Sequence, residues 1–158
     1  MADEYQFEQT FVMIKPDGVQ RGIAGEIISR LEQKGLQLVA LKMIRVDREL
    51  AERHYAEHKG KPFYPGLVEF ITSGPVIATV WEGDNAVYLV RKLVGATRPE
   101  DAEPGSIRGD FAVTTGFNIV HASDGKETAK REINLFFNTN EIHEYPLTIK
   151  KWLYEGIN

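Results

Sequence analysis

The sequence has no cysteine, which excludes disulfides, thiol nucleophiles, and zinc or iron–sulfur sites that depend on cysteine. Long hydrophobic runs are also missing, because stretches such as TFVMI and PVIATVW are far shorter than the roughly 20 residues that cross a membrane. The acidic start, MADEYQFE, has neither the basic nor the apolar part of a signal peptide. We therefore expect a cytoplasmic protein with no membrane partner.

The chain also lacks an excess of positive charge. It has 19 Lys and Arg against 23 Asp and Glu, so no nucleic-acid partner is expected and any basic site must be local. At 158 residues, 42% of them hydrophobic, the chain is long enough for one core and short for two. Since no repeat or linker interrupts it, we expect residues 1–158 to form one domain.

Hydrophobic periodicity predicts a chain that alternates strands with helices. Short runs rich in β-formers predict strands at residues 9–15, 36–46, 75–82 and 117–121. Apolar stripes at helical spacing predict helices at residues 25–35, from 48, from 65, 84–95 and from 124. Asp47, Asp124, and either Asp84 or Asn85 are the expected N-caps. This order favours an α/β sandwich of the βαββαβ type, in which helices cover a four-stranded sheet.

The segment from residue 96 to residue 115 is unusual because it shows no sustained periodicity. Pro99, Pro104, Gly105 and Gly109 punctuate it. A structureless loop of this length in a compact domain is usually functional.

Known phosphate motifs are absent, but one metal motif is present. Neither G-x-x-x-x-G-K-[ST] nor G-x-G-x-x-G occurs, which excludes a P-loop and a dinucleotide fingerprint. His54, Glu57 and His58 match H-x-x-E-H, the inverted zinc-peptidase motif. Catalytic zinc needs a third protein ligand and an open position, so a solvated helix is the simpler interpretation. A zinc-dependent hydrolase built on these three residues is the alternative function.

Three cationic residues occupy positions where phosphate could be bound. Lys15 ends the first predicted strand, Arg91 lies at the margin of an apolar helical face, and Arg108 lies between glycines in GSIRGD. Each has an ordinary explanation when taken alone, namely solvation for Lys15 and Arg108 and an ion pair for Arg91. Together, an ammonium and two guanidinium groups are suitable donors to the oxygens of a di- or triphosphate.

His121 ends the last predicted strand and is the most interesting single residue. Ser123 follows it, and the next helix carries Glu132. A neutral imidazole with one nitrogen held by a neighbouring oxygen leaves the other nitrogen free to attack. The residues alone leave two interpretations open, a partly buried histidine satisfied by hydrogen bonds and a nucleophile.

Four motifs taken together resemble the nucleoside diphosphate kinase family. TFVMIKPDGVQRG, HYAEHKGKPFYPGLVEFITSGPV, PGSIRGDF and NIVHASD occur in the family's order and spacing, between about Thr10 and Tyr154. The resemblance implies a ferredoxin-like βαββαβ fold with an antiparallel sheet of strand order 4-1-3-2. It also implies a homo-oligomer, usually a hexamer, that moves the γ-phosphate of a triphosphate such as ATP to a diphosphate such as GDP. The implied mechanism is ping-pong, and the implied cofactor is Mg²⁺, held mainly through the nucleotide phosphates.

The resemblance also assigns roles to individual residues. It implies that His121 is the phosphorylated nucleophile, that Ser123 and Glu132 orient it, and that Lys15 and Tyr55 lie close to the phosphates. Arginine and threonine side chains would hold the β and γ phosphates, and an aromatic ring would stack on the base. The nucleotide-binding residues implied in this way are Lys15, Phe63, Leu67, Arg91, Thr97, Arg108, Val113 and Asn118.

Three positions depart from the family pattern. Arg98 stands where asparagine is frequent, Phe117 where a basic or polar residue is common, and Ala122 where glycine is usual. They lie beside the implied catalytic positions, so we expect them to affect rate and assembly more than reaction type.

Overall fold

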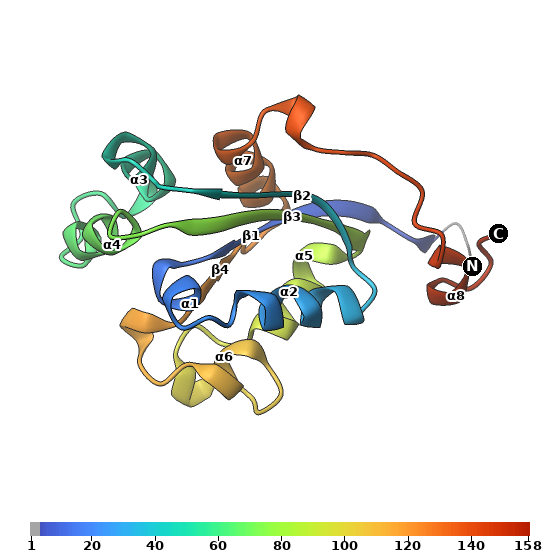
Figure 1. Ribbon diagram of the computed structural model, residues 1–158, viewed down its shortest axis with the longest axis horizontal. Helices are drawn as coiled ribbons and strands as arrows, with labels where there is room; N and C mark the ends of the chain where they lie inside the picture. Colours follow the sequence, from blue (N-terminus) through green and yellow to red (C-terminus); the bar gives the residue numbers. More distant parts are fainter. Residues whose placement is uncertain (1–3) are drawn as a thin grey trace.

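The computed structural model describes residues 4–158 and contains a four-stranded sheet with helices on both faces (Figure 1). Its strands are β1 (Phe7–Ile14), β2 (Gln37–Ile44), β3 (Val76–Asp84) and β4 (Val120–Ala122). The order across the sheet is β2-β3-β1-β4, and each neighbouring pair is antiparallel. This is the order 4-1-3-2, so the predicted α/β fold with a four-stranded antiparallel sheet is confirmed.

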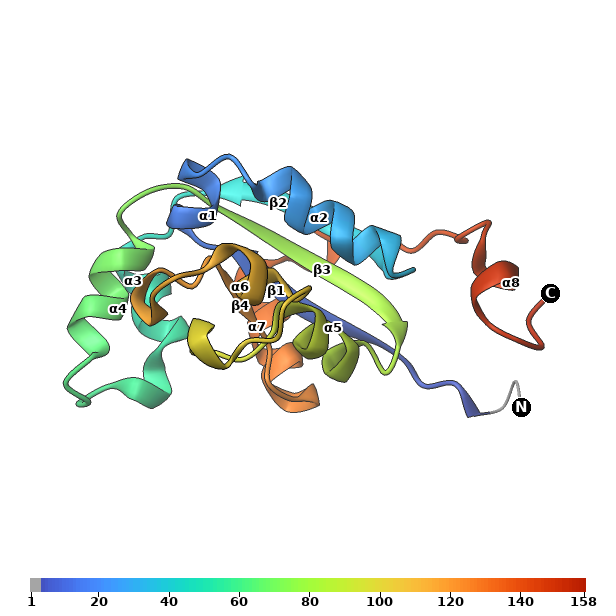
Figure 2. The same ribbon diagram turned by 90° about the horizontal axis from the view of Figure 1, so that it is seen from below.

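The helices divide between the two faces of the sheet. Those of one layer are α3 (Arg48–His54), α4 (Tyr64–Ile71) and α7 (Lys126–Phe136), and those of the other are α1 (Pro16–Gln20), α2 (Ala24–Gln33), α5 (Ala86–Val94) and α6 (Ile107–Phe111) (Figures 1 and 2). Single-turn helices are η2 (Ala56–His58), η3 (Pro99–Asp101), η4 (Thr115–Phe117) and η5 (Thr139–Glu141), and α8 (Lys150–Leu153) is near the end of the chain.

Strand β1 belongs to two hydrophobic cores at once. Successive side chains of a strand point to opposite faces. Phe11 and Met13 therefore pack with α3, α4 and α7, whereas Val12 and Ile14 pack with α2 and α5. All four are fully buried, which explains why this run of the sequence is continuously apolar.

Several element boundaries differ from those expected. The segment 96–115 is not structureless, since it contains η3 and α6, and Ser106 Oγ caps α6 by accepting from Gly109 N at 3.0 Å. Helices this short contain too few residues to show a helical period in the sequence. The N-cap of α7 is Gly125, so the expectation for Asp124 was wrong, whereas Asp47 caps α3 by accepting from Leu50 N at 2.8 Å.

The C-terminal segment returns along the edge of the sheet. His143 N donates to Val39 O at 2.8 Å, and Tyr145 Oη donates to Leu38 O. The segment then ends in α8 close to the start of β1, so both ends of the described chain lie at the same side (Figures 1 and 2). Lys150 Nζ lies 3.8 Å from the centre of the Phe7 ring. The tail therefore packs on its own chain.

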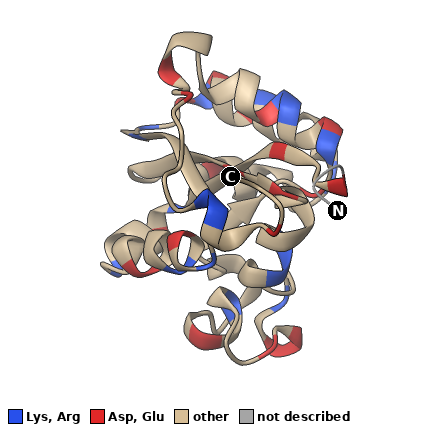
Figure 3. Cartoon of the chain, turned by 90° about the vertical axis from the view of Figure 1, so that its right-hand side faces the viewer, with Lys and Arg blue, Asp and Glu red and all other residues tan. Residues whose placement is uncertain are grey.

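The described helices are short, and basic and acidic residues are mixed. Within residues 4–158 no helix has the length and apolar character needed to cross a membrane. Figure 3 shows Lys and Arg interspersed with Asp and Glu along the same segments.

Candidate functional site

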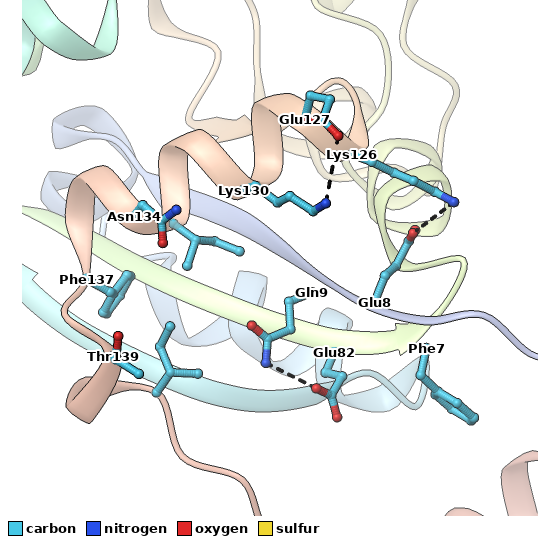
Figure 4. A pocket seen from close by; sticks show the side chains of 12 residues that line it. Phe7, Glu8, Gln9, Glu82, Lys126, Glu127, Lys130, Asn134, Phe137 and Thr139 are labelled. Carbon is cyan, nitrogen blue, oxygen red and sulfur yellow. Dashed lines mark hydrogen bonds and ion pairs between the residues drawn. The ribbon is translucent and has the colours of Figure 1, made fainter.

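One sizeable cavity is lined by none of the predicted site residues. It has a volume of about 590 Å³ and lies between α7, the start of β1 and the end of β3 (Figure 4). Its lysines face carboxylates: Lys126 Nζ is 3.5 Å from Glu8 Oε2, and Lys130 Nζ is 3.8 Å from Glu127 Oε1. With no histidine in its lining and its cations paired, this cavity offers no histidine nucleophile and no free cation for phosphate.

His121 lies on β4, where it is opposite Met13 of β1. Its Nε2 is 2.7 Å from Glu132 Oε2, and Ser123 Oγ donates to the other carboxylate oxygen, Oε1, at 2.5 Å. Glu132 faces inward because the helical period of α7 places it beside the buried Ala129, Ile133 and Phe136. It is 2% exposed, whereas 26% of the His121 side chain is exposed.

The charge on Glu132 decides the protonation pattern of His121. Burial alone would raise the pKa of Glu132, but hydrogen bonds from His121 and Ser123 and the proximity of His54 outweigh it, so its pKa lies below the ordinary value. A carboxylate only accepts hydrogen bonds, so Nε2 of neutral His121 carries the proton. The lone pair is then on Nδ1, and this nitrogen is the one free to react.

The backbone before His121 is held in a rare conformation. Ile119 has φ of 75°, and Val120 N donates to Asn118 O at 2.8 Å, which closes a three-residue γ-turn. Positive φ is strained for a β-branched residue, so its surroundings must hold it in place. Asp17 Oδ2 accepts from Ile119 N at 2.9 Å, and Ile119 O accepts from Lys15 N at 2.8 Å. Sequence reasoning missed Asp17 and Ile119, because neither carries a local signal of this contact.

Arg108 ties the long loop to the same turn. It is only 4% exposed, and its guanidinium donates to Asn118 O (3.2 Å), Gly95 O (3.0 Å) and Val120 O (2.6 Å). Burial and the nearby charge of Arg91 lower the pKa of Arg108 to about 10, so it stays charged at neutral pH. A guanidinium has five N–H groups, so two remain for another acceptor.

Lys15 and Asn118 extend this cationic region. Lys15 Nζ donates to Asn118 Oδ1, and Asn118 Nδ2 donates to Thr97 O at 3.0 Å. Burial and the charge of Arg108 lower the pKa of Lys15 to about 8, against the opposing effect of Asp17. Arg91 reaches the strand from α5, where its Nη1 donates to Ala122 O at 3.2 Å. The predicted phosphate donors are thus brought together around β4, where a bound anion would relieve the crowding of positive charge.

Tyr55 and three apolar side chains account for the other predicted residues. Tyr55 is buried, and burial together with the charge of Glu132 raises the pKa of its hydroxyl to about 12, which keeps it neutral. Phe63 at the start of α4 is 52% exposed, and Leu67 of the same helix is partly buried. Val113, between α6 and η4, is 83% exposed. Phe63 and Val113 are therefore both exposed apolar side chains.

The alternative zinc site built on His54, Glu57 and His58 is not supported. Helix α3 ends at His54, and Glu57 and His58 belong to the separate turn η2, so the helical spacing that would align the histidines is broken. His58 Nε2 is 3.8 Å from Glu57 Oε1 near the surface, whereas His54 is 3% exposed and faces His121, with ring centres 4.7 Å apart. His54 thus belongs to the surroundings of the nucleophile.

The three departures from the family pattern have different surroundings. Arg98 is exposed and forms ion pairs with Glu100 and Asp101. The ring of Phe117 packs edge-on to Phe70, 5.3 Å between centres. Ala122 is buried in the core that contains α5, where its methyl adds apolar contact while its carbonyl still accepts from Arg91.

Gly109 is expected to tolerate no side chain. A Cβ there would lie 1.9 Å from Glu103 O and 2.8 Å from Ser106 Oγ, the atom that caps α6. Gly109→Ala should therefore lower the free energy of unfolding by about 1–3 kcal/mol through overpacking, with about 1 kcal/mol more if the cap is lost. Urea unfolding measures this. Gly25→Ala in α2 is the matched control, since nothing lies within 4 Å of its Cβ and stability should be unchanged or slightly higher; equal stability of the two variants would contradict the prediction.

Comparison with known proteins gives a consistent set of relatives. The family model described as nucleoside diphosphate kinase matches residues 8–142. A nucleoside diphosphate kinase from Thermosynechococcus vestitus is 61% identical over 148 residues, which are 94% of this chain and 99% of that protein. One from Archaeoglobus fulgidus is 59% identical over 148 residues, with 94% and 98% covered.

A solved structure agrees with these relatives. The halophilic nucleoside diphosphate kinase from Halobacterium salinarum, in complex with CDP, superposes with a TM-score of 0.93 at 53% sequence identity. The match covers 95% of this chain and all of that one (100%).

Proposed function

This chain belongs to the nucleoside diphosphate kinase family, whose members move the γ-phosphate of a nucleoside triphosphate to a nucleoside diphosphate, and we propose that it does so through a phosphohistidine on His121. The observation that carries the proposal is the bond between His121 Nε2 and Glu132, 2.7 Å long. It leaves the Nδ1 lone pair directed away from the carboxylate and available to a substrate.

The proposed reaction has two mirrored halves. Nδ1 attacks the γ-phosphorus, the new N–P bond forms, and the bond from that phosphorus to the β-phosphate oxygen breaks, so that the nucleoside diphosphate leaves. The phosphorylated imidazole is cationic, and Glu132 stabilises it by accepting from Nε2–H. In the second half, a β-phosphate oxygen of the acceptor attacks the phosphorus and the N–P bond breaks. One site serves donor and acceptor in turn, which gives ping-pong kinetics.

The proposed phosphate site consists of the cationic and polar groups around β4. Phosphoryl transfer depends mainly on positioning and on stabilising charge, which Lys15, Arg91 and Arg108 are suited to do. Thr97 and Asn118 would add polar contacts, and Asn118 with Lys15 would reach the ribose and its nearest phosphate. The hydroxyl of Tyr55, which stays neutral, would lie beside the phosphates. Ser123 would act through Glu132, as its hydrogen bond to Oε1 indicates.

Mg²⁺ is the proposed cofactor and would arrive with the nucleotide. The side chains expected to contact the phosphates are mostly cations, which cannot ligate a metal ion, so the phosphate oxygens and water would hold it. Bound there, the ion neutralises part of the phosphate charge.

We propose that the nucleotide base stacks on Phe63, with Leu67 and Val113 nearby. Stacking on an aromatic ring uses no hydrogen-bonding code, so purine and pyrimidine nucleotides should both be accepted. The relative from Halobacterium salinarum was solved with CDP, a pyrimidine nucleotide, which agrees with this tolerance.

We propose that this chain assembles as a homo-oligomer, with the hexamer of the family pattern as the expected form. Strand β2 is at the edge of the sheet, and its Leu41 and Met43 are exposed, so a second copy would cover apolar surface there.

Strand β1 contributes side chains to both hydrophobic cores, which supports the proposal that the chain forms one domain. A cytoplasmic location, without nucleic-acid partners, is proposed from composition.

Phosphate labelling tests the function directly. Incubation with ATP labelled in the γ-phosphate should give an acid-labile phosphoprotein that passes its label to added GDP, because N–P bonds hydrolyse readily in acid. ATP labelled in the α-phosphate is the control and should leave the protein unlabelled. Nucleotide binding without labelling would indicate a non-catalytic nucleotide-binding protein, and release of labelled phosphate without transfer would indicate a hydrolase.

A further inference from the structure

His54 is a buried histidine that the proposed phosphoryl transfer does not use. It is 3% exposed, and neither ring nitrogen has a hydrogen-bond partner in the described structure. Leaving a buried polar atom without a partner costs about 1–3 kcal/mol. Its Nδ1 is 3.5 Å from Glu132 Oε2, the same oxygen that holds His121. A buried histidine whose ring nitrogens have no hydrogen-bond partner, and which lies beside a carboxylate, is suited to bind a ligand.

We propose that His54, His121 and Glu132 form a binding site for a transition-metal dication such as Zn²⁺, and that this ion inhibits phosphoryl transfer. Each residue offers one ligand atom, and the three atoms lie within 4.8 Å of one another. The three residues come from α3, β4 and α7, which the fold brings together.

Two of the three distances between the ligand atoms are close to those of a metal site. With bonds of about 2.0 to 2.2 Å, neighbouring ligand atoms in a tetrahedral zinc site lie roughly 3.3 to 3.6 Å apart. The 3.5 Å between His54 Nδ1 and Glu132 Oε2 already fits. The 2.7 Å between His121 Nε2 and the same oxygen must widen by about 0.6 Å, a small shift for a partly exposed side chain.

The donor set selects the class of metal. Two imidazoles and a carboxylate form the His₂Glu set that binds zinc in catalytic sites, with a fourth position for water. Imidazole suits Zn²⁺, Cu²⁺ and Co²⁺, whereas Mg²⁺ prefers oxygen ligands and retains its water. The proposed site is therefore chemically distinct from that of the nucleotide-bound Mg²⁺. Arg131 Nη2, 4.0 Å from Glu132 Oε2, belongs to a half-exposed side chain that can turn to solvent.

Binding changes the charge next to the nucleophile. Water carries the proton of His121 from Nε2 to Nδ1, so that the ring stays neutral and binds the metal through the lone pair on Nε2, and His54 contributes the lone pair of a neutral ring nitrogen. The net charge contributed by carboxylate and ion changes from −1 to +1. Because attack by Nδ1 makes the ring cationic, this change opposes phosphorylation. Nδ1 then carries the ring proton and has no lone pair with which to attack the γ-phosphorus.

Cobalt titration of the whole protein, without nucleotide, tests the site independently of activity. Wild-type protein should bind one Co²⁺ per chain with the intense visible bands of a low-coordinate site. His54→Phe keeps an aromatic ring against its neighbours and should weaken binding by about 100-fold or more, because loss of even an outer-shell partner costs roughly 10- to 100-fold. His143→Gln, in the C-terminal segment, is the matched control and should bind like wild type. Equal binding by His54→Phe, or bands of a fully hydrated ion only, would overturn the proposal.

Wild-type protein also supplies a test that does not depend on a variant's folding. In NMR spectra of ¹⁵N-histidine-labelled protein, Zn²⁺ should shift the ring signals of His54 and His121 and leave those of His58 and His143 in place. Shifts confined to His58 and His143 would contradict the proposed metal site.

The inhibitory part of the inference rests on the proposed function. Zn²⁺ should suppress labelling by ATP in the presence of Mg²⁺, a zinc-selective chelator should restore it, and His54→Phe should require about 100-fold more Zn²⁺. If the protein binds cobalt but is not labelled by ATP even in the absence of Zn²⁺, the proposed function is refuted and the metal site is still supported. Normal labelling that Zn²⁺ does not suppress would refute the inhibition.

Discussion

His121→Ala should lower the rate of phosphoryl transfer by about 10⁴-fold or more, since removal of a covalent nucleophile elsewhere costs up to about 10⁶-fold in kcat. The neighbouring imidazole of His54 is a poor replacement, because it is 3% exposed and burial, as the main cause, lowers its pKa to about 3. The groups proposed to bind phosphate, Lys15 and Arg108 among them, stay in place. We therefore expect nucleotide affinity to change little while transfer is lost.

Three measurements check the His121 prediction together. Single-turnover labelling by ATP reports the chemical step, nucleotide titration reports affinity, and circular dichroism reports folding. His143→Ala is a matched control, because it removes an imidazole from the C-terminal segment and should leave the labelling rate unchanged. A labelled His121→Ala protein, or activity within about tenfold of wild type, would show that the nucleophile is another group.

Glu132→Gln should give the second largest effect, a loss of about 10²- to 10⁴-fold in the rate of phosphohistidine formation, as when the carboxylate that orients a catalytic histidine is neutralised. Glutamine keeps the shape of the side chain but not its charge. If its amide oxygen accepts from Nε2–H, the cationic phosphohistidine loses its counter-ion. If its NH₂ donates to Nε2 instead, the proton moves to Nδ1 and the reacting lone pair disappears.

The control for Glu132→Gln comes from the same helix. Glu127 is an exposed carboxylate whose nearest cation is Lys130, 3.8 Å away, so Glu127→Gln should leave the single-turnover rate unchanged. Weaker nucleotide binding by Glu132→Gln with an unaltered rate of phosphohistidine formation would mean that Glu132 has a structural role only.

Much of the fold was predictable because its signals are local. The apolar run of β1, the helical stripes of α2, α5 and α7, and the cap Asp47 each follow from residues close together in sequence. Short elements escaped prediction, since five residues of α6 are too few to show a period. The N-cap of α7 was misplaced by one residue, because Gly125 adopts the extended cap conformation and Asp124 precedes it.

The site residues were predictable in kind but not in arrangement. His121, Ser123 and Glu132 are near one another in sequence, so their contact could be anticipated, and their catalytic roles stay predictions. The alternative zinc motif stayed open at the level of sequence because the sequence does not show that α3 ends at His54. In the structure His54 lies beside Glu132, which is far from it in sequence, and no local pattern predicts such a contact.

The sequence by itself determined the order of strands and helices, the family, and the types of group available for phosphate chemistry, because periodicity and motifs are properties of neighbouring residues. Only the tertiary structure decided that Glu132 holds Nε2 and leaves Nδ1 free, that Asp17 supports the strained turn at Ile119, and that His54 faces the nucleophile. These are distances and hydrogen bonds between separate elements, and they exist only after the sheet and its two helical layers have packed.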